Sequence, residues 1–192
     1  MMSISNDRSL DVGDRILEAA ADCVVAFGVG RVTLAEIARR AGVSRPTVYR
    51  RWPDTQSVLA ALLTEQITGV LADVPLRGQG REAVVNRVVA LAQRLRADDL
   101  ISSVLHAAPE LAMVYIADRL GTSQQILIDA LASDLRVAQR GGSVRAGNPR
   151  RLAAMVLLIT QSTIQSAQIV APILDADALA AELSYALNRY LS

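Results

Sequence analysis

The chain has 192 residues, which is enough for one large or two small domains with a substantial core. Hydrophobic residues make up 52% of it, which excludes a disordered chain, and the net charge is only +1. Any affinity for nucleic acid must therefore come from a local basic patch. Cys23 is the single cysteine, in an apolar helical segment, so we expect a buried structural thiol and a reducing cytoplasm.

The first third of the chain carries start and stop signals for four helices. Asp11 can cap the first of them. Thr33, with Glu36 three residues later, has the spacing of a capping box and opens the second. Gly42 makes a turn, and Ser44 caps a short third helix. The predicted ranges are about 11–27, 34–41, 45–52 and 55–70.

The rest of the chain is also helical in its periodicity. The segment 75–80, PLRGQG, is the best internal boundary. No segment alternates as a strand does, and apolar runs such as 155–159 are too short to span a bilayer. Further helices are predicted over about 81–97, 99–106, 110–139, 149–170 and 177–191. The fold class is all-α, with about nine helices.

The segment 33–52 has the layout of a helix-turn-helix, whose second helix can lie in the major groove of DNA. Between Arg31 and Arg51 there are six arginines and one acid, Glu36, so this segment is a local basic patch. Arg45, near the start of the second helix, is best placed to reach base edges. Tyr49 and Arg51 suit phosphates, because they carry hydroxyl and guanidinium donors.

The segment 14–63 resembles the N-terminal signature of the TetR family of bacterial transcription regulators. The resemblance rests on the Thr that opens the second helix, Ala-Gly-Val-Ser at the turn, Thr-Val-Tyr in the recognition helix, and the aromatic-Pro-Asp exit. It implies an all-α dimer with a DNA-binding region over 1–54, a linking fourth helix over about 55–72, and a ligand-binding, dimerising body over 73–192. The predicted DNA-binding residues are Thr33, Ser44, Arg45, Pro46, Thr47, Tyr49, Arg50 and Arg51.

The chain departs from the family pattern at two places. Thr55 stands where many members carry a lysine that meets a phosphate, so this contact is weakened or replaced by hydrogen bonding. Arg50 and Arg51 stand where many members carry His or Tyr, and their extra charge can offset the missing lysine.

The body carries no metal-ligand spacing, phosphate loop or activated nucleophile, so we expect no cofactor, no metal and no enzymatic activity. In the family the last two long helices pair with those of a second subunit. Apolar stripes on the last two helices fit this expectation: Leu152, Met155, Val156, Ile159 and Thr163 on one, and Leu179, Leu183, Ala186, Leu187 and Tyr190 on the other.

A family ligand pocket lies among the middle helices. The polar groups predicted to face it are His106, Tyr115, Gln161 and Gln165, although the glutamines, with Gln168, equally suit the dimer interface. The scarcity of aromatic residues, 3%, favours an aliphatic cavity and an apolar effector.

The sequence thus predicts a cytoplasmic, dimeric repressor that binds a palindromic double-stranded DNA operator and is released by a small molecule, with no membrane contact. The alternatives are an activator, a regulator whose body only dimerises, a nonspecific architectural DNA binder, and a small helical enzyme. The near-neutral net charge disfavours the architectural binder, and the single His and single Cys disfavour the enzyme.

Overall fold

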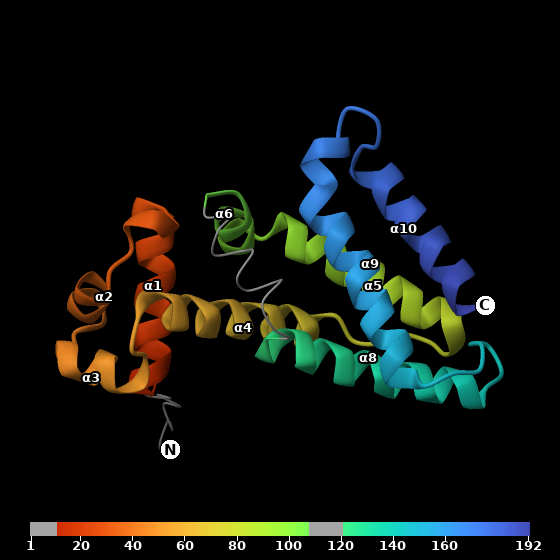
Figure 1. Ribbon diagram of the computed structural model, residues 1–192, viewed down its shortest axis with the longest axis horizontal. Coiled ribbons are helices and arrows are strands. Elements are labelled where there is room, and N and C mark those ends of the chain that lie inside the picture. The colour runs from red at the N-terminus through yellow and green to blue at the C-terminus, as the bar shows by residue number, and fades with distance from the viewer. Residues whose placement is uncertain (1–10, 108–120) are drawn as a thin grey trace, which may run out of the picture. The chain divides into compact units, whose positions relative to one another are not determined.

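The computed structural model describes residues 11–107 and 121–192. Nine α-helices and one 3-10 turn account for the regular structure of these residues, with no strand among them, so the all-α prediction is confirmed (Figure 1). The chain divides into two compact units, here called the N-terminal unit (Met1–Leu62) and the C-terminal unit (Leu63–Ser192). This division falls inside the fourth helix, whereas the sequence placed its boundaries near residues 54 and 72.

The N-terminal unit is built from short helices around a small apolar core. Its helices are α1 (Val12–Phe27), α2 (Leu34–Ala41), α3 (Arg45–Arg51) and the start of α4 (Thr55–Asp73), with the 3-10 turn η1 (Val29–Arg31) after α1. Ile16, Cys23, Ile37, Val48 and Val58 are completely buried. The predicted buried thiol is therefore confirmed, and burial raises the pKa of Cys23 above its ordinary value.

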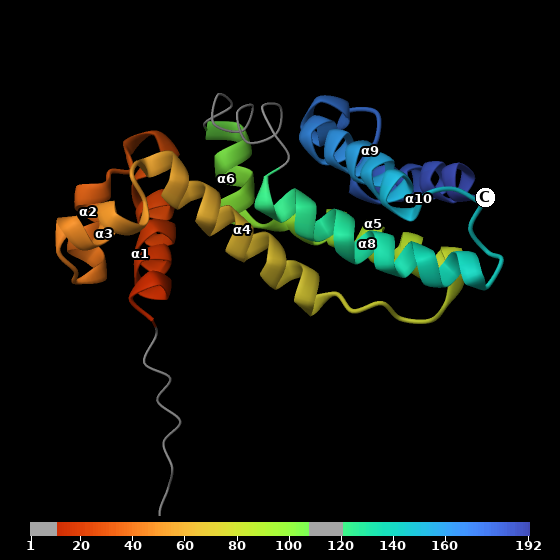
Figure 2. The ribbon, with the colours of Figure 1, turned by 60° about the horizontal axis from the view of Figure 1, so that its bottom comes forward.

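The C-terminal unit packs long helices around a larger core. It contains the end of α4, then α5 (Gly80–Ala97), α6 (Asp99–Ala107), α8 (Thr122–Arg140), α9 (Pro149–Val170) and α10 (Ala176–Leu191). The helices α5, α8, α9 and α10 lie against one another (Figure 2). Val85, Leu135, Val156 and Leu187 are among the fully buried side chains of this core.

The prediction of one helix over 110–139 is wrong. Gly121 has an extended backbone, with φ −68° and ψ 168°, and is the residue before α8. Its N–H donates to Oε1 of Gln124 at 2.8 Å. The side chain of Gln124 therefore caps the first turn of α8 at this glycine. The residue with the least helical preference in this stretch therefore marks the true start of the helix.

The apolar stripes assigned to the dimer interface are largely internal instead. Leu183 and Leu187 of α10, and Leu152 and Val156 of α9, are each at most 4% exposed and belong to the core of the C-terminal unit. These four positions are apolar because they close this core, so they provide no evidence for a second subunit, whereas Met155 and Ala186 of the predicted stripes are exposed.

A different face of α9 is apolar and uncovered. Met155, Leu158 and Ile169 are 42%, 60% and 81% exposed. By length and composition α9 is long and apolar enough to cross a membrane, although the sequence predicted no such segment, and only 22% of its most apolar window is buried. Its packing against α5, α8 and α10 and its run of Gln, Ser and Thr are typical of a packed helix with one side left open.

Candidate nucleic-acid interface and ligand cavity

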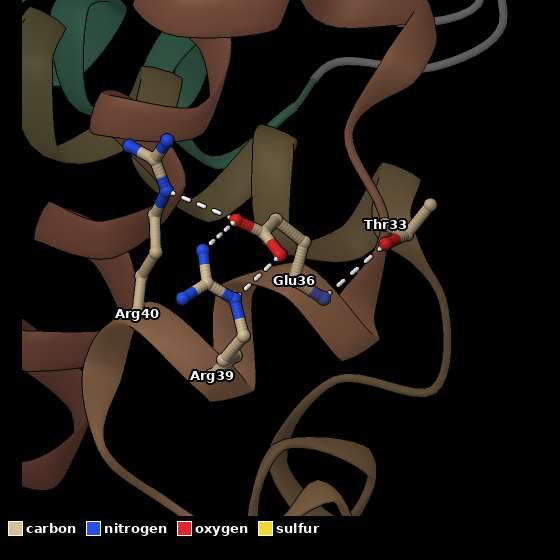
Figure 3. A network of polar contacts seen from close by, with 4 residues as sticks. All are labelled: Thr33, Glu36, Arg39 and Arg40. Atoms are coloured by element: carbon tan, nitrogen blue, oxygen red, sulfur yellow. Dashed lines mark hydrogen bonds and ion pairs between the residues drawn. The ribbon is translucent and has the colours of Figure 1, made fainter.

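The start of α2 is held by half of the predicted capping box. The Glu36 backbone N–H donates to Oγ1 of Thr33 at 3.2 Å, as a capping threonine requires. The Glu36 carboxylate does not return to Thr33 (Figure 3). It accepts instead from Arg39 at 2.9 and 2.6 Å and from Arg40 at 3.2 Å.

This Glu36 network removes two arginines from the free positive charge of the patch. Hydrogen bonds from Arg39, joined by those from Arg40, lower the pKa of Glu36 to about 2. The Glu36 carboxylate is therefore ionised at neutral pH. Arg40 also lies over the ring of Phe27, at 4.8 Å from the ring centroid.

The turn between α2 and α3 depends on Gly42, whose φ of 63° and ψ of 36° lie in the left-handed region. The N–H of Val43 donates to the Ala38 carbonyl at 3.0 Å, which closes the end of α2. Ser44 then caps α3, because its Oγ accepts from the Thr47 N–H at 3.3 Å and contacts Thr47 Oγ1 at 2.7 Å.

The exposed face of α3 gathers four of the predicted DNA-binding residues. Val48 is fully buried and fixes the inner side of this helix. At roughly 100° per residue, Pro46 and Arg50 lie opposite Val48, Tyr49 lies to one side, and Arg45 is on the first turn at the border of the buried side. All four are exposed. Thr47 is half-buried beside Ser44.

Arg51 points elsewhere and is engaged within the protein. Its guanidinium donates to Oδ2 of Asp11, the residue before α1, at 3.1 Å. The hydrogen bond from Arg51 is the main reason why the pKa of Asp11 lies below its ordinary value. In the part of the chain that the structure describes, Arg31, Arg45 and Arg50 are the arginines of the patch with no ion-pair partner.

Thr55, the departure from the lysine of many family members, is the half-buried first residue of α4. The start of this helix is fixed by Asp54 and Ser57. Oδ1 of Asp54 accepts from the Ser57 N–H at 2.7 Å, and these hydrogen bonds lower the pKa of Asp54.

Sequence reasoning missed Arg15, whose side chain crosses from α1 to the end of α2. Its Nη2 donates to the carbonyls of Ala41 at 2.6 Å and Gly42 at 3.4 Å. Carbonyls at a helix end have no partner within the helix, so a cation there stabilises them. No periodicity could reveal a contact between residues 26 positions apart.

Replacing Arg15 with Ala should lower the free energy of unfolding of the N-terminal unit by about 1.5 kcal/mol, because charged hydrogen bonds to the end of α2 are lost. Trp52, the single tryptophan, lies at the end of α3 and reports this unfolding by fluorescence. Arg31→Ala is the matched control, since Arg31 is exposed and lacks an ion-pair partner within 11–107 and 121–192. Equal unfolding curves for the two variants would contradict the capping role.

The C-terminal unit holds a cavity of about 160 Å³. Its walls come from α4, α5, α6, α8 and α9, and they are mainly Leu, Ile, Val and Ala side chains. Of the glutamines considered from the sequence, Gln161 and Gln165 lie in the wall, whereas Gln168 is exposed and does not line the cavity. The side chain of His106 and all of Tyr115 lie outside the described residues.

Two cavity residues that the sequence analysis did not single out form an ion pair. Arg87 of α5 donates to Asp134 of α8 at 2.6 Å, and the two side chains are 16% and 18% exposed. Nε of Arg87 also donates to the Val74 carbonyl at 2.8 Å, and Nη2 to the Leu71 carbonyl at 3.4 Å. Arg87 therefore ties the end of α4 to α5 and α8.

Comparisons with known proteins agree with this arrangement. The family described as bacterial regulatory proteins, tetR family, matches residues 16–62. A Mycobacterium bovis protein, the uncharacterized HTH-type transcriptional regulator Mb2274c, is 68% identical over 191 residues, which is 100% of both chains.

Two solved structures share the fold at low sequence identity. The transcriptional repressor QsdR of R. erythropolis, from the TetR family, has a TM-score of 0.73 at 16% identity over 94% of each chain. RolR in complex with resorcinol has a TM-score of 0.73 at 18% identity, over 94% of this chain and 87% of that chain. With a full-length relative named as a transcriptional regulator and a matching helix-turn-helix signature, this chain belongs to the tetR family of bacterial transcriptional regulators.

Proposed function

We propose that the protein is a cytoplasmic, dimeric repressor that binds a palindromic operator and is released by a small effector. The observation that carries this proposal is the exposed face of α3, where Arg45, Tyr49 and Arg50 stand on a helix fixed by Ser44 and by Val48. Two exposed guanidinium groups and a phenol supply donors for hydrogen bonds to base edges and phosphates. Residues 1–54 would form the DNA-binding region, with Thr33, Ser44, Pro46, Thr47 and Arg51 as further contacts.

The uncovered face of α9 supports the dimer. Met155, Leu158 and Ile169 are spaced along one side of this helix, and Ile173 after it is 85% exposed. An apolar helix face of this length is covered in a soluble protein, and a second copy covers it symmetrically. Two α3 helices placed by such a dimer would read two half-sites about one helical turn apart.

The cavity supports control by an effector. Leu63, Ile67 and Leu71 of α4 form part of its wall, and α4 begins beside the DNA-binding helices in the chain. A ligand in the cavity would contact α4 directly and shift the equilibrium between two positions of this helix. RolR, which shares the fold, forms a complex with resorcinol, so a protein of this fold can bind a ligand the size of one ring.

Selection of binding sites from a random duplex library with the purified protein tests the proposal. A recovered palindrome is the expected result, and it would also give the operator. If no preferred sequence is recovered at moderate salt, the proposal of sequence-specific operator binding is overturned. Binding of a single unrepeated half-site would instead contradict the dimer.

Arg45→Ala should relax base preference, with a loss of about 1–3 kcal/mol on the preferred operator and little change on random DNA. Tyr49→Phe should weaken binding to the operator and to random DNA alike, because a phosphate contact carries no sequence information. Titration of each variant against both duplexes at one salt concentration measures this difference. Equal losses on both duplexes for Arg45→Ala would show that Arg45 contacts only the backbone.

Asp11→Asn should strengthen operator binding by a few-fold and steepen its salt dependence. The substitution keeps the shape of the side chain but releases Arg51 from its ion pair, so that one more cation can displace a counterion from DNA. The slope of log K against log [salt] should become more negative by about 0.9. Glu18→Gln, which removes an exposed negative charge from the helix α1 that follows Asp11, is the control. An equal change in slope for this variant would contradict the role of Arg51.

A further inference from the structure

The two charged side chains in the cavity wall bind each other. Arg87 and Asp134 neutralise each other, and further N–H groups of Arg87 go to the carbonyls of Leu71 and Val74. Oγ1 of Thr160 donates to the Val156 carbonyl at 2.8 Å within α9. The wall residues that the structure describes therefore offer a ligand no unpaired charge.

The amide groups of the wall are oriented by a chain of hydrogen bonds. The backbone N–H of Gly121 can only donate, so the atom of Gln124 that it meets is Oε1. Nε2 of Gln124 consequently donates to Oε1 of Gln161 at 3.2 Å. Gln124 is 7% exposed and has both side-chain polar atoms engaged, while Gln161 and Gln165 are more exposed and accessible to water.

What remains for a ligand is hydrocarbon surface. Leu63, Ile67, Leu91, Ile101 and Ile164 bring side chains from α4, α5, α6 and α9 to the same space. A charged group placed against this surface would lose its hydration without gaining a partner, and a neutral polar group would lose hydrogen bonds to water.

The size of the cavity sets the size of the ligand. Its volume is about 160 Å³. An apolar cavity of about 150 Å³ stays dry and binds benzene. A single ring, or a branched aliphatic group of similar bulk, is therefore the matching size.

We propose that the effector is an uncharged molecule that is predominantly hydrocarbon and about the size of one ring, and that the buried polar groups of the wall exclude charged analogues by being paired already. This inference rests on the proposed function, in which the C-terminal unit binds an effector. It adds the chemical class of that effector.

Three probes of nearly the same shape test the class: α-methylstyrene, acetophenone and benzoate. They present a hydrocarbon, a neutral carbonyl and a carboxylate at the same position of one ring. The readout is the methyl NMR spectrum of the full chain labelled at isoleucine. Ile67, Ile101 and Ile164 line the cavity, while Ile16 and Ile37 are buried in the N-terminal unit and serve as internal references.

We expect α-methylstyrene to shift the three cavity methyls and to bind at least tenfold more tightly than acetophenone, because the buried carbonyl loses its hydrogen bonds to water. Benzoate should leave these methyls unchanged. Ala130→Leu, whose larger side chain would fill part of the cavity, should weaken the binding of α-methylstyrene at least tenfold. Ala72→Leu, on the exposed side of α4, should leave this binding unchanged.

The other outcomes are distinguishable. Acetophenone binding as tightly as α-methylstyrene would show that the wall supplies a hydrogen bond, and benzoate binding most tightly would show an available cation. Either result overturns the chemical class but leaves an effector site in place. No cavity shift with any probe overturns the inference and the effector part of the proposed function, while the operator selection still decides DNA recognition. If Ala130→Leu does not fold, the ranking of the probes on the unmodified chain decides alone.

Discussion

Leu158→Asp is expected to leave the protein monomeric and to lower its operator affinity by two orders of magnitude or more. Leu158 is 60% exposed on α9, between Met155 and Ile169, so the substitution leaves the core of the C-terminal unit intact. In a dimer the new carboxylate would be buried without a partner, at a cost of several kcal/mol. A monomer engages one half-site at a time and loses the large gain in affinity that linking two sites provides.

Light scattering after gel filtration measures the mass, and titration of a palindromic operator measures the affinity. Ser133→Asp places the same charge on an exposed position of α8 and should change neither quantity. If the Leu158→Asp protein remains dimeric, the dimer interface does not lie on this face of α9. A monomer with unchanged operator affinity would contradict cooperative reading of two half-sites.

The helices of the N-terminal unit were predictable almost to the residue, because their ends are set by local hydrogen bonds. Thr33 and Ser44 each bind an N–H three residues later, and Gly42 takes the one backbone conformation that favours glycine. Such signals lie within a few positions of one another in the sequence, so a pattern can reveal them. The same locality explains why the resemblance to the tetR family was specific.

The interaction partners of each side chain were less predictable, because they depend on the three-dimensional arrangement and can lie far apart in the chain. Glu36 was expected to complete a capping box but binds Arg39 and Arg40, and Arg51 was expected to be free but is paired with Asp11, 40 positions away. Charge counting therefore overstated the free positive charge of the patch. Local spacing cannot rank competing partners for one carboxylate.

The two sides of α9 show the same limit in the C-terminal unit. Both are apolar, so periodicity identifies the helix without telling which side closes the core. The structure assigns Leu152 and Val156 to the core and leaves Met155 and Leu158 open. Only the positions of α5, α8 and α10 decide this, and those positions arise from contacts over long separations.

The pair Arg87–Asp134, 47 positions apart, is the long-range contact with the largest expected consequence. Arg87→Ala should lower the free energy of unfolding of the C-terminal unit by about 3 kcal/mol, because the Asp134 carboxylate would stay largely buried without its partner. The double variant Arg87→Met, Asp134→Leu should recover most of this loss, since apolar side chains of similar size fit a hydrocarbon wall. Urea unfolding of the single and double variants measures both effects.

An exposed ion pair that also involves α5 provides the matched control. Nη1 of Arg94 in α5 and Oδ2 of Asp73 in α4 are 3.8 Å apart, but the two side chains are 56% and 74% exposed. Arg94→Ala should therefore lower the free energy of unfolding by less than about 1 kcal/mol. An Arg87→Ala protein no less stable than Arg94→Ala would contradict the buried pair.

The stable double variant then separates stability from control of DNA binding. Arg87 holds the end of α4 through the Leu71 and Val74 carbonyls, and neither Met nor Leu can replace these hydrogen bonds. We therefore expect the double variant to bind the operator normally but to release it poorly when α-methylstyrene fills the cavity. Unchanged release would mean that the ligand acts on α4 through Leu63, Ile67 and Leu71 alone, without the Arg87 connection.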